Sequence, residues 1–133
     1  LIAAENDVTA MHDITEGGVL GAIFEMAKAA NKGFVLFTEK IYIPDAVNEI
    51  CRVLDLDPLA LISSGAMLIT ASDPAPLLDA LAKAGIKANV IGKIREEGKR
   101  IIYPNGSCRE VLTTPRDELW RFLEMVKKEG VAG

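Results

Sequence analysis

The stretch from residue 8 to residue 19 constrains the fold of this chain more than any other. A short apolar run over residues 8–11 ends at His12 and Asp13, two glycines follow at 17 and 18, and a helical pattern then covers residues 19–30. A strand is therefore expected to pass through a polar turn into the start of a helix. Free amides and the helix dipole at such a start favour an anion. We expect this turn to be the functional part of the chain.

Strands and helices alternate through the rest of the sequence. Apolar residues at helical spacing predict helices over residues 45–54, 74–84 and 117–126, and short apolar runs predict strands at 34–37, 66–70, 90–94, 101–103 and 109–112. The strand at 90–94 is expected to form a hairpin with 101–103, and Asn105-Gly106 predicts a type I′ turn after it. This order predicts an α/β (α+β) sandwich, in which helices pack on a mixed sheet.

Length and composition limit the possible classes of protein. The 133 residues are half apolar and fit one domain, and 15 basic against 19 acidic residues give a net charge of -4 without a basic block. This balance argues against nucleic acid or an anionic membrane as partner. No apolar run approaches the ~20 residues that cross a bilayer, and no signal peptide precedes the first strand, so we expect a cytoplasmic protein.

Two further features of the sequence bear on cofactors and completeness. Cys51 and Cys108 lie far apart and the chain has one histidine, so neither a zinc site nor a disulfide framework is indicated. The first residue is Leu rather than Met, which suggests a piece of a longer chain with a partner domain before it.

The polar turn holds more ionisable groups than a helix cap needs. Asp13 or Thr15 could cap the helix, but His12, Asp13 and Glu16 together indicate a ligand. A carboxylate here would act through a metal or orient a nucleophile, and His12 could serve as acid, base or hydrogen-bond donor. Purely structural roles for these residues remain open.

The glycines and two other positions also have alternative interpretations. Gly17 and Gly18 allow either a ligand or a packed backbone to approach closely, and the sequence does not choose between these. The second polar turn, with Ser64 and Gly65, could end a helix or bind a ligand. Trp120 could anchor a partner or lie half-buried.

These stretches together resemble a known family. Residues 8–18, the helix after them, Ile43-Pro44, residues 56–59 and residues 63–65 are similar to the C-terminal domain of the AIR synthase (PurM) superfamily, nearest to its HypE-like hydrogenase maturation and AIR synthase-related branch. The similarity runs from about residue 8 to residue 112, with the motifs in the same order.

The resemblance implies that residues 1–133 are the C-terminal domain of a two-domain, ATP-dependent enzyme. The N-terminal ATP-binding domain, outside this chain, would carry the Mg2+-binding carboxylates and the homodimer interface. Such enzymes activate a carbonyl or amide-type oxygen with ATP phosphate, here for nickel-iron hydrogenase maturation with a maturation partner protein. ATP and Mg2+ would bind the full-length protein, with no metal held by this domain alone. The alternative is a non-catalytic ligand-sensing or partner-binding module.

The resemblance also implies roles for particular residues. They would be catalytic for His12 and Asp13, and ligand- or phosphate-binding for Thr15, Glu16, Gly17, Gly18, Ser64 and Gly65. Two positions depart from HypE-like sequences, which often have Arg at the position of Glu16 and end in a cysteine that carries the activated thiocarboxamide. This chain ends at Gly133 without one, so it is either shortened or acts on another substrate.

Overall fold

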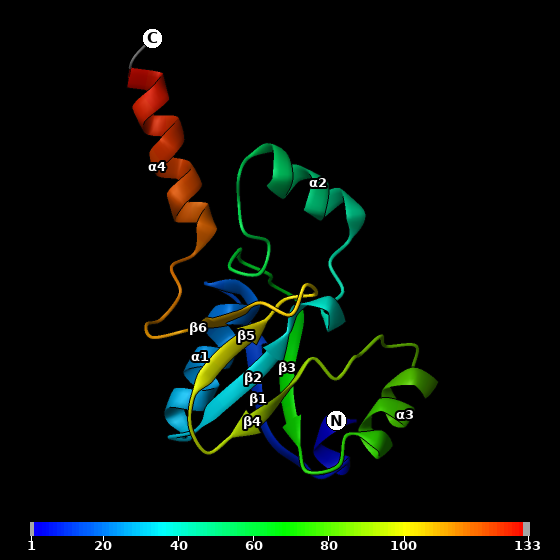
Figure 1. The fold of residues 1–133 in the computed structure, drawn as a ribbon. Helices are drawn as coiled ribbons and strands as arrows, with labels where there is room; N and C mark the ends of the chain where they lie inside the picture. Colours follow the sequence, from blue (N-terminus) through cyan, green and yellow to red (C-terminus); the bar gives the residue numbers. More distant parts are fainter. Residues whose placement is uncertain (1, 132–133) are drawn as a thin grey trace.

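The computed structural model describes residues 2–131, and Figure 1 shows how their helices and strands are arranged. In chain order the elements are η1 (Ala3–Glu5), β1 (Val8–Ile14), α1 (Gly18–Ala29), β2 (Gly33–Phe37), η2 (Thr38–Lys40), α2 (Asp45–Val53), β3 (Ala66–Ala71), α3 (Ala75–Lys83), β4 (Gly92–Arg95), β5 (Lys99–Ile102), β6 (Cys108–Glu110) and α4 (Glu118–Val131). Residues 132 and 133, where the comparison with a terminal cysteine falls, lie outside the described part.

The strands form two sheets. Strands β1 and β3 make an antiparallel ribbon, and the larger sheet has the order β4-β2-β5-β6. In that sheet β2 runs parallel to β5, while β2–β4 and β5–β6 are antiparallel, so the sheet is mixed. The predicted α/β class, with helical packing on a mixed sheet, is confirmed.

Helix α1 joins the two sheets through one hydrophobic core. Its buried side chains include Leu20 and Phe24, and they pack in one cluster with Leu68 of the ribbon and with Phe34 and Ile101 of the larger sheet. Each fully buried side chain of this size contributes about 1.5–3 kcal/mol to stability. The start of α1 is therefore held rigidly by the best-packed part of the molecule.

Two details of the larger sheet differ from the sequence-based expectation. Strands β4 and β5 do not form a hairpin, because β2 lies between them and pairs with both. The apolar β2 gains more by burial in the centre of the sheet than at an edge.

The Asn105-Gly106 turn is not type I′, which needs positive φ at both residues. Only Gly106 has it (φ 79°), and the Gly106 N–H donates to the Tyr103 carbonyl, so the turn starts one residue earlier than predicted.

Strand β1 is longer than predicted. It continues past Met11 because His12, Asp13 and Ile14 pair in register with Leu68, Met67 and Ala66 of β3. Because their backbones pair with β3, the polar residues His12 and Asp13 belong to the strand. The expectation that His12 and Asp13 belong to the turn is therefore wrong, and the turn consists of residues 15–17.

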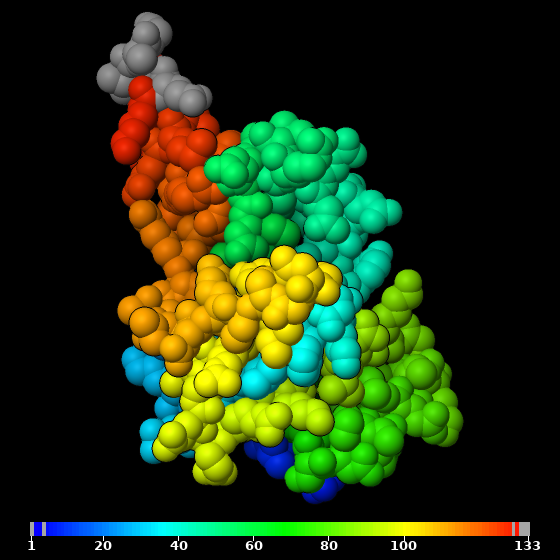
Figure 2. Space-filling model, in the orientation of Figure 1, coloured from blue at the N-terminus to red at the C-terminus, as the bar shows by residue number. Residues whose placement is uncertain are grey.

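Helices α2 and α4 rise together from one end of the molecule, whereas α3 lies at the other end (Figures 1 and 2). The predicted apolar stripe of α4 is only partly covered. Leu119 and Phe122 are half-buried, while Leu123 and Val126 are 37% and 47% exposed. Helix α4 thus contacts the domain through its first turns and presents much of its apolar face to solvent.

Candidate functional site

The glycine pair at the start of α1 is packed against another loop. Both glycines have left-handed φ angles, 79° for Gly17 and 60° for Gly18. A Cβ at Gly18 would lie 2.5 Å from the Leu59 carbonyl oxygen and 2.6 Å from that of Leu61. The Leu20 N–H donates to the same Leu59 oxygen at 3.1 Å. Close backbone packing, one of the two interpretations left open by the sequence, therefore accounts for Gly18.

The carboxylate that caps this turn comes from a hundred residues away. The Gly17 N–H donates to Asp117 Oδ2 at 2.6 Å, and the Leu119 N–H donates to Asp117 Oδ1 at 2.8 Å. Asp117 is 3% exposed. One buried side chain thus caps α4 and closes the turn before α1, a role that the sequence had suggested for Asp13 or Thr15. The Gly18 N–H donates to the Thr15 carbonyl at 3.1 Å.

Glu16 contacts the same C-terminal segment. Its Oε1 accepts a hydrogen bond from Trp120 Nε1 at 2.7 Å, although both side chains are exposed at the surface. Trp120 is 47% exposed and its indole N–H is hydrogen-bonded, so the residue fits both a partner anchor and a partly covered side chain.

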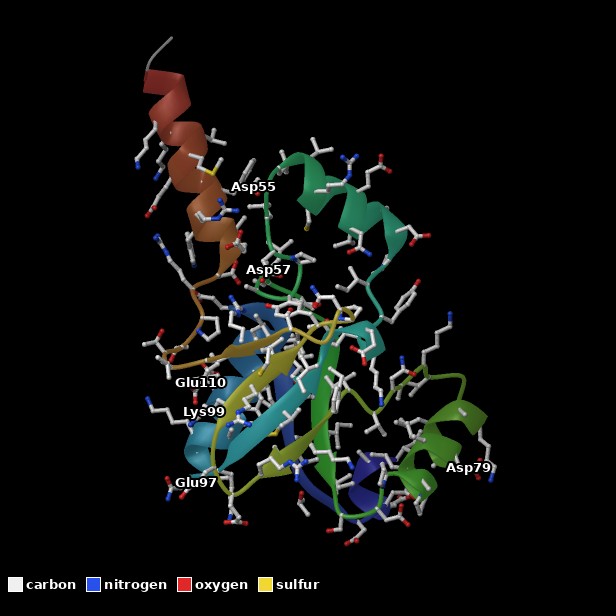
Figure 3. All side chains as sticks on the ribbon, viewed as in Figure 1. Asp55, Asp57, Asp79, Glu97, Lys99 and Glu110 are labelled. Carbon is white, nitrogen blue, oxygen red and sulfur yellow. The ribbon has the colours of Figure 1, made fainter. Side chains whose placement is uncertain are left out.

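A second set of contacts fixes the base of α4 to the loop after α2. Glu118 Oε2 accepts hydrogen bonds from the Asp57 amide at 3.2 Å and from Arg121 Nη2 at 2.7 Å. The Arg121 hydrogen bond, with help from that amide, holds the pKa of Glu118 below its usual value despite partial burial. Arg121 also lies 3.6 Å from Asp55, and Figure 3 shows Asp55 and Asp57 on the loop beside α4.

The two predicted catalytic residues point to opposite faces of β1, because neighbouring residues alternate along a strand. His12 faces α1, where its Nε2 lies 3.1 Å from Glu25 Oε2, and its Nδ1 lies 2.6 Å from the Asp13 carbonyl oxygen. The Asp13 side chain is exposed and makes no hydrogen bond or ion pair with residues 2–131. The structure does not bring these two side chains together.

The remaining predicted site residues gather at one end of the β1–β3 ribbon. The last pair in the register is Ile14 with Ala66, so Thr15 and Gly65 lie just beyond it. Ser64 and Gly65 are exposed, and Gly65 has a φ of 97° with open space where a Cβ would point. Thr15, Glu16, Ser64 and Gly65 are thus exposed at this end of the ribbon, whereas Gly17 and Gly18 are buried. The ligand-binding role of all six residues remains a prediction.

An open hollow of about 1810 Å³ lies beside this end of the ribbon, and His12 and Ser63 are among its lining residues. Most of the lining is apolar, and it includes residues of β1, β3, α1 and α3, of the loops beside α2 and of the segment before β4. No group of three or more His, Cys, Asp or Glu side chains within the described residues could hold a metal ion. No helix in the part of the chain that the structure describes is long and apolar enough to cross a membrane.

Sequence reasoning missed Asp117, Glu118 and Arg121 as parts of this region. Asp117 lies at the start of the last predicted helix, where it accepts from the Leu119 N–H and caps that helix. Its second bond, to Gly17, joins residues 100 positions apart and leaves no local pattern.

Comparison with known proteins identifies the class to which this fold belongs. Residues 1–104 match the family described as AIR synthase related protein, C-terminal domain. The chain belongs to this family, as its sequence motifs indicate.

Relatives within the family carry hydrogenase maturation names. A protein of Methanocaldococcus jannaschii, provisionally named a hydrogenase expression/formation protein, is 35% identical over 112 residues, which cover 81% of this chain and 33% of the relative. The carbamoyl dehydratase HypE of Azotobacter vinelandii is 28% identical over 120 residues, covering 84% of this chain and 35% of that protein. The chain spans about a third of the length of these relatives.

Solved structures of HypE proteins share the fold. E. coli HypE superposes with a TM-score of 0.77 at 28% identity, covering 91% of this chain and 40% of that one. HypE in a complex with HypF gives 0.73 over 84% of this chain and 38% of its own. HypE in complex with ATP gives 0.68 over 83% of this chain and 38% of its own. The last two are 23% identical and establish the fold alone.

Proposed function

We propose that this chain is the C-terminal domain of an ATP-dependent, HypE-like enzyme that activates a carbonyl or amide-type oxygen with ATP phosphate in hydrogenase maturation. The observation that carries the proposal is the extent of the alignment with carbamoyl dehydratase HypE, which covers 84% of this chain but 35% of that protein. One domain of a larger enzyme is the simplest source of such a pattern.

The proposed chemistry turns the substrate oxygen, which is a poor leaving group, into a good one by phosphorylation. The substrate oxygen attacks the terminal phosphorus of ATP and ADP leaves. The carbon–oxygen bond of the phosphorylated group then breaks and releases phosphate. With a primary amide, nitrogen gives up two protons and a nitrile group results. Positioning and electrostatic stabilisation supply most of the catalysis in phosphoryl transfer.

Asp13 is the best placed residue of this chain to accept such a proton. Its carboxylate is exposed on the ribbon face opposite α1 and makes no ion pair with residues 2–131, whereas His12 contacts Glu25. We propose that Thr15, Glu16, Ser64 and Gly65 form the wall of the cleft next to it.

The other components of the proposed enzyme lie outside this chain. An N-terminal domain binds ATP with Mg2+ and forms the homodimer interface, and its junction with this domain covers the apolar hollow. A maturation partner is expected by analogy with the complex of HypE and HypF. The nucleotide is expected by analogy with HypE bound to ATP.

Replacement of Asp13 tests the proposal in the full-length protein with Mg2+. Asp13→Asn should lower the rate of ATP turnover about 100-fold or more, the usual contribution of a general base. Asp79→Asn is the matched control, because Asp79 is exposed on α3 and pairs with Lys83 at 2.9 Å. Full-length protein that neither binds nor hydrolyses ATP, with Asp13→Asn unchanged from Asp79→Asn, would contradict the proposal and favour a non-catalytic module.

A further inference from the structure

We propose that helix α4 pairs with the α4 of a second copy of this chain, antiparallel about a two-fold axis. The surface that pairs is the α4 face, the exposed side of the helix formed by Trp120, Leu123 and Val126. This contact is separate from the homodimer interface that we propose for the N-terminal domain, and it does not depend on the ATP chemistry.

The α4 face is an apolar stripe on one side of the helix. Trp120, Leu123 and Val126 are 47%, 37% and 47% exposed. Their spacing of three residues places them within an arc of about 120° around the helix axis. Arg121 lies on the opposite side of the helix, 3.6 Å from Asp55 in the loop after α2. The stripe therefore faces away from the loop that holds α4.

Helix α4 projects from the body of the domain, so a second molecule can reach it along its length. It rises away from both sheets, with α2 on one side of it (Figures 1 and 2). With 14 residues the helix is about 21 Å long. An antiparallel arrangement places the two domains at opposite ends of the helix pair, which keeps them apart.

A cation and an aromatic ring make the α4 face complementary to itself. Lys127 follows Trp120 by two helical turns, about 10.5 Å, and both side chains are exposed on the same side of the helix. Glu16 Oε1 accepts from Trp120 Nε1 at 2.7 Å, so a carboxylate lies at the edge of the indole ring. An ammonium group is attracted by the face of an indole and by a carboxylate. The base of the α4 face therefore attracts a cation, and its far end carries one.

Antiparallel pairing brings these groups together twice. Where Lys127 of one copy reaches Trp120 of the other, the two-fold axis requires the reciprocal contact as well. Leu123 lies midway between residues 120 and 127, so it falls beside the axis and packs on its own counterpart. Antiparallel helices also bring opposite ends of their dipoles together. These features favour a second copy of this chain over an unrelated apolar partner.

The expected affinity is modest, because a pair of 14-residue helices buries a small area. Such a contact falls below the roughly 1,200 Å² of total buried surface at which stable interfaces begin. We therefore expect a dimer dissociation constant on the order of 10–500 μM.

Sedimentation equilibrium of the 133-residue protein, from about 10 μM to about 1 mM, tests the pairing. Leu123→Gln should raise the dissociation constant about tenfold, because it removes the apolar contact at the axis. Ile86→Gln is the matched control, since Ile86 is 50% exposed and lines the hollow just after α3, at the other end of the molecule.

The charged contact has variants of its own. Lys127→Gln should raise the dissociation constant about fivefold to thirtyfold, because its contact with Trp120 occurs twice in each dimer, whereas Lys127→Arg should keep it within about twofold. Lys128→Gln is the control, because Lys128 is exposed about 100° further round the helix. Circular dichroism and thermal unfolding establish that each variant is folded.

A protein that stays monomeric at about 1 mM, or equal affinities of Lys127→Gln and Lys128→Gln, would overturn the inference. A dimer that is weakened by Ile86→Gln and not by Leu123→Gln would also overturn it, because association would then use the hollow. None of these outcomes bears on ATP turnover by the full-length protein, so the proposed function is tested separately.

Discussion

At the scale of single residues, two adjacent glycines illustrate how much an amino-acid pattern can and cannot predict. The sequence identifies Gly17 and Gly18 as positions where something approaches the backbone, and the structure identifies that group for Gly18 as the loop at Leu59 and Leu61. A ligand and a packed loop impose the same demand on a glycine, so sequence alone could not distinguish them.

A pair of glycine substitutions separates backbone strain from packing. Gly106→Ala places a Cβ in open space at a φ of 79° and should cost about 1–2 kcal/mol, the strain of left-handed backbone alone. Gly18→Ala, at a φ of 60°, adds a clash 2.5 Å from the Leu59 oxygen and should cost about 1–3 kcal/mol more. Urea unfolding of both variants measures the difference. Equal losses of unfolding free energy would contradict the packing role of Gly18.

The structure brings some of the predicted site residues together and separates others. Thr15, Glu16, Gly17, Gly18, Ser64 and Gly65 lie at one end of the ribbon because β1 and β3 pair there. His12 and Asp13 are separated onto two faces, because pairing with Leu68 and Met67 extends the strand through them. Polar residues usually signal a turn, and only the partner strand overrides that signal.

At the scale of elements, strand pairing and helix docking account for most of the differences from expectation. The helical spacing of apolar residues in α1 and the apolar run of β2 are patterns among neighbouring residues. Both elements were therefore predicted close to their observed bounds. The insertion of β2 between β4 and β5 is non-local, and so is the docking of α4 on the loop at Asp57. Only packing against distant segments decides such arrangements.

The docking of α4 should depend on pH through Glu118. Its pKa is lowered in the folded protein, chiefly by the hydrogen bond from Arg121, from a usual value of 4.5. The interaction therefore stabilises the fold above pH 4.5 and is lost as the pH falls through the lower, folded pKa. Glu118→Gln should lower the free energy of unfolding at pH 7, with the gap from wild type closing as the pH falls from 4.5 through the lowered pKa.

The matched control for this change is Glu110→Gln, because Glu110 is exposed on β6. Chemical denaturation at pH 7, 5 and 3.5 provides the measurement. A gap between Glu118→Gln and wild type that is absent at pH 7, or that widens at low pH, would contradict the assigned role of Glu118.

At the scale of the whole molecule, the chain has the composition of an independent domain but leaves a large apolar surface uncovered. Half of its residues are apolar and α1 is well buried, as the sequence predicts for a folded domain. The open hollow of about 1810 Å³ and the exposed side chains of α4 are not visible in sequence, because a periodic apolar stripe looks the same whether it faces a core or a partner. We attribute the hollow to the position of the proposed N-terminal domain.

The central claim is that this domain serves an ATP-dependent enzyme without binding ATP tightly itself. Calorimetric titration of ATP with Mg2+ into the 133-residue chain and into the full-length protein tests it most directly. The account predicts saturable binding to the full-length protein, with a dissociation constant on the order of 1–100 μM, and no measurable heat of binding to this chain alone. Equally tight binding to both proteins, or no binding to the full-length protein, would contradict it.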